Sequence, residues 1–257
     1  MHIRTAAAAT VGSLALLTLL ASTAQADTHK GDTALTSVTF SKTTVNVGIS
    51  EIQKLTASAT LKDNSGIKTV MGLKLVSPDG HIQFAKSSTC TRPTSTTMKC
   101  TWSYNLDPDD TTDDYFDLRN SSAGTWHLDL EAAAYDGDFY TLDSSVTMKI
   151  KRYAKLATTQ ATPEPVAKGK TLTVTGALTR ADWNTNKYVG FAAQKVALQF
   201  KKSGTSTYTT VKTVTTDSTG KLKTTTTANA SGTWRWHFAG TGTTSSATAA
   251  GDGVALK

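Results

Sequence analysis

An acidic segment between residues 107 and 117 carries the side chains with the clearest potential for chemistry. Its sequence, Asp107-Pro-Asp-Asp-Thr-Thr-Asp-Asp-Tyr-Phe-Asp117, places six carboxylates within eleven residues. Like charges repel each other, so such a segment has a raised affinity for a counter-ion. Calcium takes about six to eight oxygen ligands in a forgiving geometry. We therefore expect a calcium site with ligands from Asp107, Asp109, Asp110, Asp113, Asp114 and Asp117.

The spacing in this segment is not that of an EF-hand loop. Asp107 and Asp109 fit the first positions, but the glycine and the final glutamate of that loop are missing. A second acidic turn contains Asp136 and Asp138, and the sequence leaves open whether it faces the same end of the molecule. The alternative interpretation is a solvated acidic loop without a specific ion.

Two further features could serve a partner. Trp183 and Tyr188 flank a loop, where exposed aromatic rings can stack on sugars or anchor a protein, unless both rings fold back over the core. Basic side chains are frequent in the C-terminal part: Lys168, Lys170, Lys187, Lys195, Lys201, Lys202, Lys212, Lys221, Lys223 and Arg235. They suggest an anionic cell-wall polymer or acidic polysaccharide, or simply a soluble lysine-rich surface. The chain has no recognised nucleic-acid-binding motif.

The sequence gives little support for a catalytic site. The sequence contains neither a Gly-x-Ser-x-Gly elbow nor a His-Glu-x-x-His zinc motif. Paired carboxylates for glycoside hydrolysis could lie in the acidic segment, but a loop holds the necessary spacing poorly. We therefore predict a protein that is not an enzyme and keep a hydrolase as the weakest of three hypotheses.

The elements that must position these residues are β-strands. Hydrophobic residues recur at every second position, as in Trp234, Trp236 and Phe238, where the spacing places three aromatic rings on one face of a strand. The phrase Gly-Thr-Trp at 232–234 also occurs at 124–126. One chain with two copies of a core strand predicts two copies of a β-domain. Short strands separated by Asp-, Pro- and Gly-containing turns are typical of an immunoglobulin-like sandwich.

The sequence divides into three parts. Residues 1–26 have a positive start, a short hydrophobic run and an Ala-x-Ala end, which predicts a cleaved signal peptide and a secreted, extracellular protein without a membrane anchor. Residues 27–153 and 154–257 are expected to form the two domains. Residues 27–152 carry 16 acidic and 13 basic side chains, whereas residues 153–257 carry 4 and 13. In an exported chain, Cys90 and Cys100 are expected to form a disulfide between neighbouring strands.

The run from Pro165 to Gly176, together with 194–200, 208–214 and 232–236, resembles a bacterial immunoglobulin-like module of secreted actinobacterial proteins. Residues 50–152 look like the module that often precedes it. The resemblance implies an all-β fold of two tandem immunoglobulin-like sandwiches and no established activity. Some members of that family are labelled calcium-binding, which would fit the acidic segment but implies no particular residues.

Two main hypotheses follow. The first is a calcium-associated extracellular binding protein, and the second is a protein that attaches to the cell wall or a polysaccharide through its basic domain, without a metal. They differ in a simple respect: only the first predicts that calcium raises the melting temperature. The sequence leaves the oligomeric state open.

Overall fold

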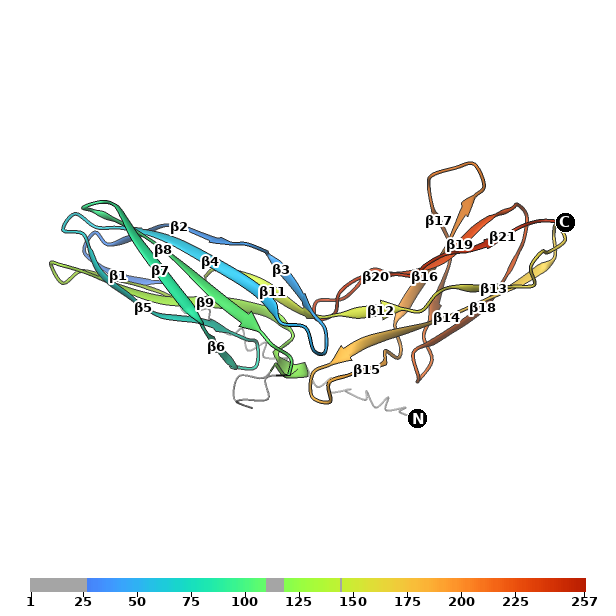
Figure 1. Cartoon of the computed structure of the whole chain (residues 1–257), viewed down its shortest axis with the longest axis horizontal. Coiled ribbons are helices and arrows are strands. Elements are labelled where there is room, and N and C mark those ends of the chain that lie inside the picture. The colour runs from blue at the N-terminus through green and yellow to red at the C-terminus, as the bar shows by residue number, and fades with distance from the viewer. Residues whose placement is uncertain (1–26, 110–117, 144) are drawn as a thin grey trace, which may run out of the picture.

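The computed structural model describes residues 27–109, 118–143 and 145–257, which form two β-sandwiches placed end to end (Figure 1). The predicted signal peptide, residues 1–26, lies outside the described residues, as do residues 110–117 of the acidic segment. Within the described ranges the only helical element is the short 3-10 helix η1 (Asn120–Ser122). No helix in this part of the chain is long and hydrophobic enough to cross a membrane.

The first sandwich contains strands β1 to β11. One sheet has the order β2 (Ala34–Phe40), β4 (Gln53–Lys62), β8 (Thr97–Leu106) and β7 (Ser87–Thr94). The other has the order β3 (Thr44–Val47), β11 (Thr147–Arg152), β9 (Gly124–Ala134), β5 (Ile67–Val76) and β6 (Ile82–Phe84). The N-terminal half of β9 pairs with β11, and its C-terminal half pairs with β10 (Phe139–Leu142). Strand β10 in turn pairs with β1 (Thr28–Lys30).

The second sandwich contains strands β12 to β21. In one sheet, β14 (Thr171–Asp182) pairs with β12 (Ala154–Leu156), β13 (Gln160–Thr162), β15 (Lys187–Gly190) and β18 (Lys221–Thr227). The other sheet runs β17 (Thr209–Thr215), β16 (Lys195–Lys202) and β19 (Gly232–Phe238), and β19 also pairs with β20 (Ala247–Thr248) and β21 (Asp252–Val254).

The strand order confirms the predicted immunoglobulin-like class. The orders β2-β4-β8-β7 and β11-β9-β5 match the two sheets of that fold, with β2, β4, β8 and β7 as strands A, B, E and D. Strand β3 follows β2 in the chain but runs parallel to β11 in the other sheet. The chain therefore crosses from one sheet to the other between β2 and β3. A parallel bridge between Val166 and Leu256 repeats this switch in the second sandwich. The chain is therefore all-β, with two tandem sandwiches.

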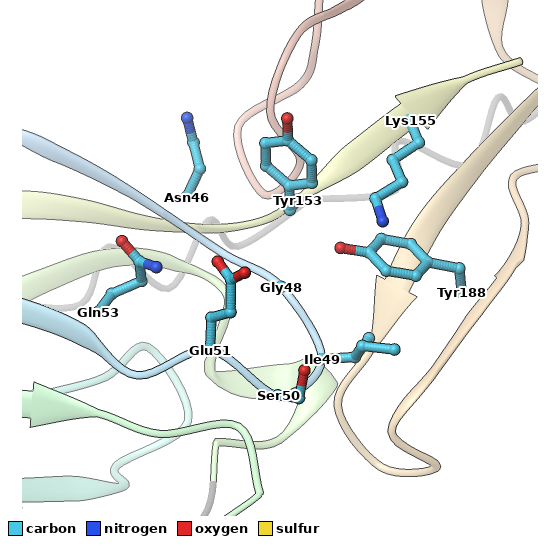
Figure 2. Close-up of a pocket in the computed structure, with 9 residues that line it drawn as sticks. All are labelled: Asn46, Gly48, Ile49, Ser50, Glu51, Gln53, Tyr153, Lys155 and Tyr188. Atoms are coloured by element: carbon cyan, nitrogen blue, oxygen red, sulfur yellow. The ribbon is translucent and has the colours of Figure 1, made fainter.

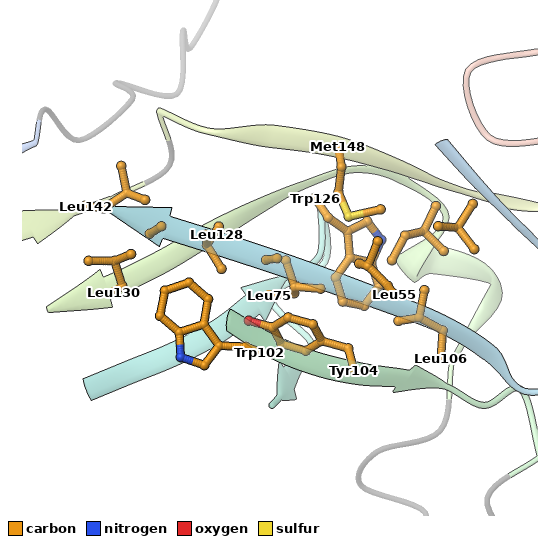
Figure 3. Packing of buried hydrophobic residues seen from close by; sticks show 14 of the residues in the cluster. Leu55, Leu75, Trp102, Tyr104, Leu106, Trp126, Leu128, Leu130, Leu142 and Met148 are labelled. Atoms are coloured by element: carbon orange, nitrogen blue, oxygen red, sulfur yellow. The ribbon is translucent and has the colours of Figure 1, made fainter. Parts of the chain in front are cut away.

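The repeated Gly-Thr-Trp phrase opens the equivalent strand of each sandwich, β9 and β19. In β19 the side chains alternate between buried and half-buried, and Trp234, Trp236 and Phe238 all point into the core. In β9 the buried set includes Trp126 and Leu128. Figure 3 shows Trp126 among the leucines of the first core. The period-two pattern therefore correctly identified the core-facing side of both strands.

The cysteine pair forms the expected disulfide. Cys90 on β7 and Cys100 on β8 are direct cross-strand partners, and their sulfurs are bonded. Every residue of β7 is exposed, because the strand lies at the sheet edge. The disulfide therefore fastens an edge strand to its neighbour, as the sequence predicted, and does not link the two sheets.

Candidate functional site

Four aspartates converge at the end of the first sandwich that lies away from the second. Asp32 follows β1, Asp63 follows β4, and Asp136 and Asp138 lie in the turn between β9 and β10. One carboxylate oxygen from each can be chosen so that all four oxygens lie within 4.8 Å of one another. Three turns that are far apart in the sequence thus bring a compact set of oxygen ligands to one point.

Asp63 is the fixed member of this cluster, which we call the four-aspartate cluster. Its side chain is buried and accepts hydrogen bonds from Thr33 Oγ1 at 2.6 Å, Ser65 Oγ at 2.6 Å and the Ser65 backbone at 2.8 Å. Burial raises the pKa of Asp63, but the hydrogen bonds from Ser65 and Thr33 together outweigh it, so the pKa lies below its ordinary value. The group is therefore a carboxylate at neutral pH.

The other members are also tied to the turns. The Asp32 backbone N–H donates to Asp138 Oδ2 at 3.1 Å, and the Asp136 N–H donates to Ser65 Oγ at 3.2 Å. Asp138 lies directly over Gly31, where an added Cβ would be 1.5 Å from its Oδ2. Only glycine leaves room for the Asp138 carboxylate at this position, because any larger residue would displace it.

The ammonium group of Lys30 lies beside the same turn, where it donates to the carbonyl of Gly137 at 3.4 Å. One cation near four carboxylates leaves an excess of negative charge. Such a cluster, made only of carboxylates, favours a hard cation that takes oxygen ligands.

Asp107 and Asp109, the two aspartates of the acidic segment that the structure describes, lie at the opposite end of the sandwich, where Asp109 contacts Asn186 of the second domain. Both precede β9, whereas Asp136 follows β9, and this strand of 11 residues spans roughly 35 Å at about 3.3 Å per residue. In the described part of the chain, Asp107 and Asp109 therefore do not share an end of the sandwich with Asp136 and Asp138.

Of the six predicted calcium ligands, the structure describes two. Asp109 Oδ1 accepts a hydrogen bond from Asn186 Nδ2 of the second sandwich at 2.7 Å, and Asp107 Oδ1 accepts one from the Asp109 backbone at 3.0 Å. The remaining four, Asp110, Asp113, Asp114 and Asp117, lie outside the described residues. A calcium site in this segment stays a prediction.

Trp183 requires a correction, because its ring is not exposed to a partner. It is only 3% exposed and packs in the hydrophobic core of the first sandwich, although it follows β14 of the second. Its Nε1 donates to the carbonyls of Val47 at 3.3 Å and Gly48 at 2.9 Å. The sequence suggested that this loop could cover the end of its own domain; the structure shows the tryptophan inserted into the neighbouring one. Tyr188, in contrast, is half-buried at the domain junction.

A buried arginine reinforces the same junction. Arg152, at the end of β11, donates from Nε to the carbonyl of Ala181 at 2.6 Å, and its guanidinium lies 3.7 Å from Asp182. Burial lowers the pKa of Arg152 to about 10, the nearby charge of Arg180 acts in the same direction, and Asp182 partly offsets both. The side chain remains charged at neutral pH, so it links the two sandwiches electrostatically.

The acidic turns can be found in the sequence, but the sequence does not show that they lie close together in the folded domain. Asp63 and Asp136 each begin a glycine-containing turn. In an immunoglobulin-like order, the turns after β4 and β9 lie at the same end of the sandwich. Combining that topology with the acidic turns would have found the cluster; residue spacing alone could not.

Comparisons with known proteins add little to this geometry. No family model matches the chain, and no curated protein matches it. Solved structures that align include the D0-D1 domain of Intimin (16% identity over 86% of this chain and 98% of that chain, TM-score 0.28). Three N-terminal domains of the bacteriophage RB49 outer capsid protein Hoc align at 11% identity over 88% and 71%, with a TM-score of 0.30. Dimeric latent PorU from Porphyromonas gingivalis aligns at 12% identity with a TM-score of 0.28, and this chain spans 20% of its length. Similarities this distant carry no argument about function.

Proposed function

We propose that this chain is a secreted, non-enzymatic binding protein whose first domain holds a calcium ion in the four-aspartate cluster. Its similarity to secreted actinobacterial tandem immunoglobulin-like proteins is part of this proposal. The disulfide between Cys90 and Cys100 supports export, because such bonds persist in oxidising compartments outside the cytosol.

The observation that carries the calcium proposal is the convergence of the four carboxylates within 4.8 Å. Asp63 offers a preformed ligand, since its hydrogen bonds hold it in place before an ion arrives. Four carboxylates with water in the remaining positions provide the all-oxygen environment that calcium prefers. An ion there would join the three turns and stiffen the free end of the first sandwich. The acidic segment 107–117 remains the alternative calcium site that the sequence predicts.

Calcium is expected to raise the melting temperature of the first domain. At a free concentration 100-fold above its dissociation constant, a ligand that binds only the folded state adds about 2.7 kcal/mol. The shift should amount to several degrees. Differential scanning calorimetry with calcium, and then with excess chelator, measures it.

Two isosteric variants separate the two acidic regions. The double variant Asp136→Asn/Asp138→Asn should abolish the calcium shift, whereas Asp107→Asn/Asp109→Asn should preserve it if the four-aspartate cluster is the site. The opposite pattern would place calcium in the acidic segment. No shift at millimolar calcium in the unaltered chain would remove the metal from the proposal and leave the aspartates as turn-closing groups.

The non-enzymatic part of the proposal rests on the sequence, which contains no recognised catalytic motif, and two histidines that could serve as bases lie in different domains. His127 faces Asp129 at 3.4 Å on the first sandwich, whereas His237 on the second contacts the Thr248 hydroxyl at 2.9 Å. The two histidines belong to different domains. Neither of the two contacts just described involves a serine hydroxyl. Neither of these two contacts brings a nucleophile, a base and an orienting carboxylate together.

A second candidate function is attachment to an anionic wall polymer through the second sandwich. The guanidinium of Arg235 lies 3.6 Å from the ring centroid of Tyr208, and Lys201 lies 5.1 Å from the same ring. Gln199 Oε1 accepts a hydrogen bond from Arg235 Nε at 2.9 Å, which holds the guanidinium in place. This basic cluster, on β16, β19 and the loop before β17, could pair with phosphate or carboxylate groups.

The basic cluster predicts salt-sensitive retention on heparin resin or purified cell wall. Arg235→Gln/Lys201→Gln should elute at clearly lower salt than Lys221→Gln/Lys223→Gln, which removes equal charge from β18 in the opposite sheet. Equal elution of the two variants would show that net charge alone governs retention. Retention unchanged at high salt would contradict an electrostatic origin.

A further inference from the structure

A polar groove lies where the two sandwiches meet, and neither the calcium proposal nor the basic cluster uses it. Its volume is about 510 Å³, within the range of roughly 300–1,000 Å³ that is common for small-ligand sites. Figure 2 shows that its lining side chains come from both domains. Those used below are Asn46, Glu51, Gln53, Tyr153, Lys155 and Tyr188.

Both domains build this groove, so it exists only in the assembled chain. Asn46 belongs to β3 and Gln53 begins β4, on the first sandwich. Lys155 on β12 and Tyr188 on β15 come from the second, and Tyr153 lies between the two. The neighbouring insertion of Trp183 holds the domains in place. The groove is therefore preformed, which lowers the entropy that a ligand must lose on binding.

Three of its polar side chains have no hydrogen-bond partner within the described residues. The side chains of Asn46, Glu51 and Gln53 form no hydrogen bond with another residue in the described part of the chain. Elsewhere in the molecule, carboxylates such as Asp63 and Asp79 are held by several partners. Planar amide and carboxylate groups can each engage two neighbouring hydroxyls at once. The groove thus offers both donors and acceptors to a ligand.

Tyr153 supplies the open aromatic surface of the groove, because the Lys155 ammonium covers one face of the Tyr188 ring. Tyr153 is 41% exposed. Tyr188 is fixed more firmly, because the Lys155 ammonium lies 3.7 Å from its ring centroid. A Cβ at Gly48 would come within 3.1 Å of the Tyr188 hydroxyl, so the glycine allows this close approach. An exposed aromatic ring beside these polar groups suits a ligand with an apolar face and a polar rim.

We propose that this groove binds a neutral saccharide. A sugar ring presents C–H groups to an aromatic face and hydroxyls around its edge, which matches the exposed Tyr153 ring beside Asn46, Glu51 and Gln53. A hydrophobic ligand fits poorly, because Ile49 is the only aliphatic side chain in the lining. An anionic ligand is not favoured either, since Glu51 offsets the charge of Lys155. Peptide recognition would use deep side-chain pockets or strand addition, and this open, polar lining offers no such pocket.

Nuclear magnetic resonance titration of the full chain tests this inference. Cellotetraose, chitotetraose and maltotetraose are each added to 5 mM, and sorbitol serves as a polyol without a ring face. At least one tetrasaccharide should shift the Tyr153 and Tyr188 resonances with a millimolar or tighter dissociation constant, whereas sorbitol should not. Tyr153→Ala and Gln53→Ala should each weaken that binding at least tenfold. Tyr135→Ala, which removes a tyrosine that is 62% exposed on the first sandwich, should leave it unchanged.

Several outcomes would overturn the saccharide assignment. These are no response to any of the three tetrasaccharides, equal affinity in Tyr153→Ala, or a response only to tetragalacturonate that disappears in high salt. Shifts of the same resonances by tetraalanine but by no sugar would identify a peptide site instead. Chelator should not change saccharide binding, because the four-aspartate cluster lies at the other end of the first sandwich. Failure of the calcium proposal and failure of this one are therefore distinguishable.

Discussion

Trp236→Ala is expected to destabilise the second domain by about 3–5 kcal/mol, the usual cost of truncating a buried tryptophan. The side chain is fully buried in the middle of β19, and its Nε1 donates to the Thr175 carbonyl at 3.0 Å. Truncation removes a ring that buries about 150–250 Å² and leaves that carbonyl without its donor. Domains of this size have a stability of about 5–15 kcal/mol, so a large share of the total disappears.

Scanning calorimetry of the full chain measures the effect. The transition of the second domain should fall by more than about 10 °C, while that of the first should change little. His237→Ala is the matched control, because the next residue of the same strand points outward and should cost no more than about 1 kcal/mol. A melting curve for Trp236→Ala that matched the control would show that this face of β19 is not core.

The packing of the Trp236 ring can also be tested by a substitution on β14, the strand that faces it in the other sheet. Gly176 on β14 leaves space for Trp236, because a Cβ at this position would lie 2.6 Å from Cδ1 of the indole. Gly176→Ala should therefore destabilise the second domain by about 1–3 kcal/mol through overpacking. Combined with Trp236→Ala, the same substitution should cost much less, since the ring that it displaces is gone.

Trp183→Ala is expected to lower the stability of the first domain, although the residue belongs to the second. The indole packs in the core of the first sandwich and donates to the carbonyls of Val47 and Gly48. Its backbone N–H also donates to Asn120 Oδ1 at 2.9 Å, next to the bond from the Asn120 N–H to Asn184 Oδ1 at 2.8 Å. Removing the ring should cost about 3–5 kcal/mol at the domain junction.

The junction prediction has two readouts. Calorimetry should show a lower transition for the first domain, and small-angle X-ray scattering should show a wider distribution of shapes once the domains separate. Trp183→Phe retains a ring but loses the Nε1 donor, so it should fall between the unaltered chain and Trp183→Ala. If Trp183→Ala changed neither readout, the indole would not couple the domains. Loss of saccharide binding in this variant would agree with a groove that needs both domains.

The sequence by itself determined the local structure. Extended strands follow from hydrophobic residues at every second position, and the buried face of β19 could be named in advance because Trp234, Trp236 and Phe238 alternate with polar residues. The repeated Gly-Thr-Trp phrase predicted two domains of one kind. Pairing of Cys90 with Cys100 required only that two cysteines lie on neighbouring strands. These are properties of single strands and near neighbours, which residue type and spacing control.

Only the tertiary structure decided which distant groups meet. Asp32, Asp63, Asp136 and Asp138 lie in three turns and form one cluster because the strand order returns those turns to the same end of a sandwich. Trp183 lies in the turn between β14 and β15, as its sequence context suggested, but the sequence does not say which domain that turn contacts; the short connection at Tyr153 brings it against the first core. Sequence spacing fixes the direction of a side chain relative to its own strand, whereas long-range contacts depend on how whole sheets pack.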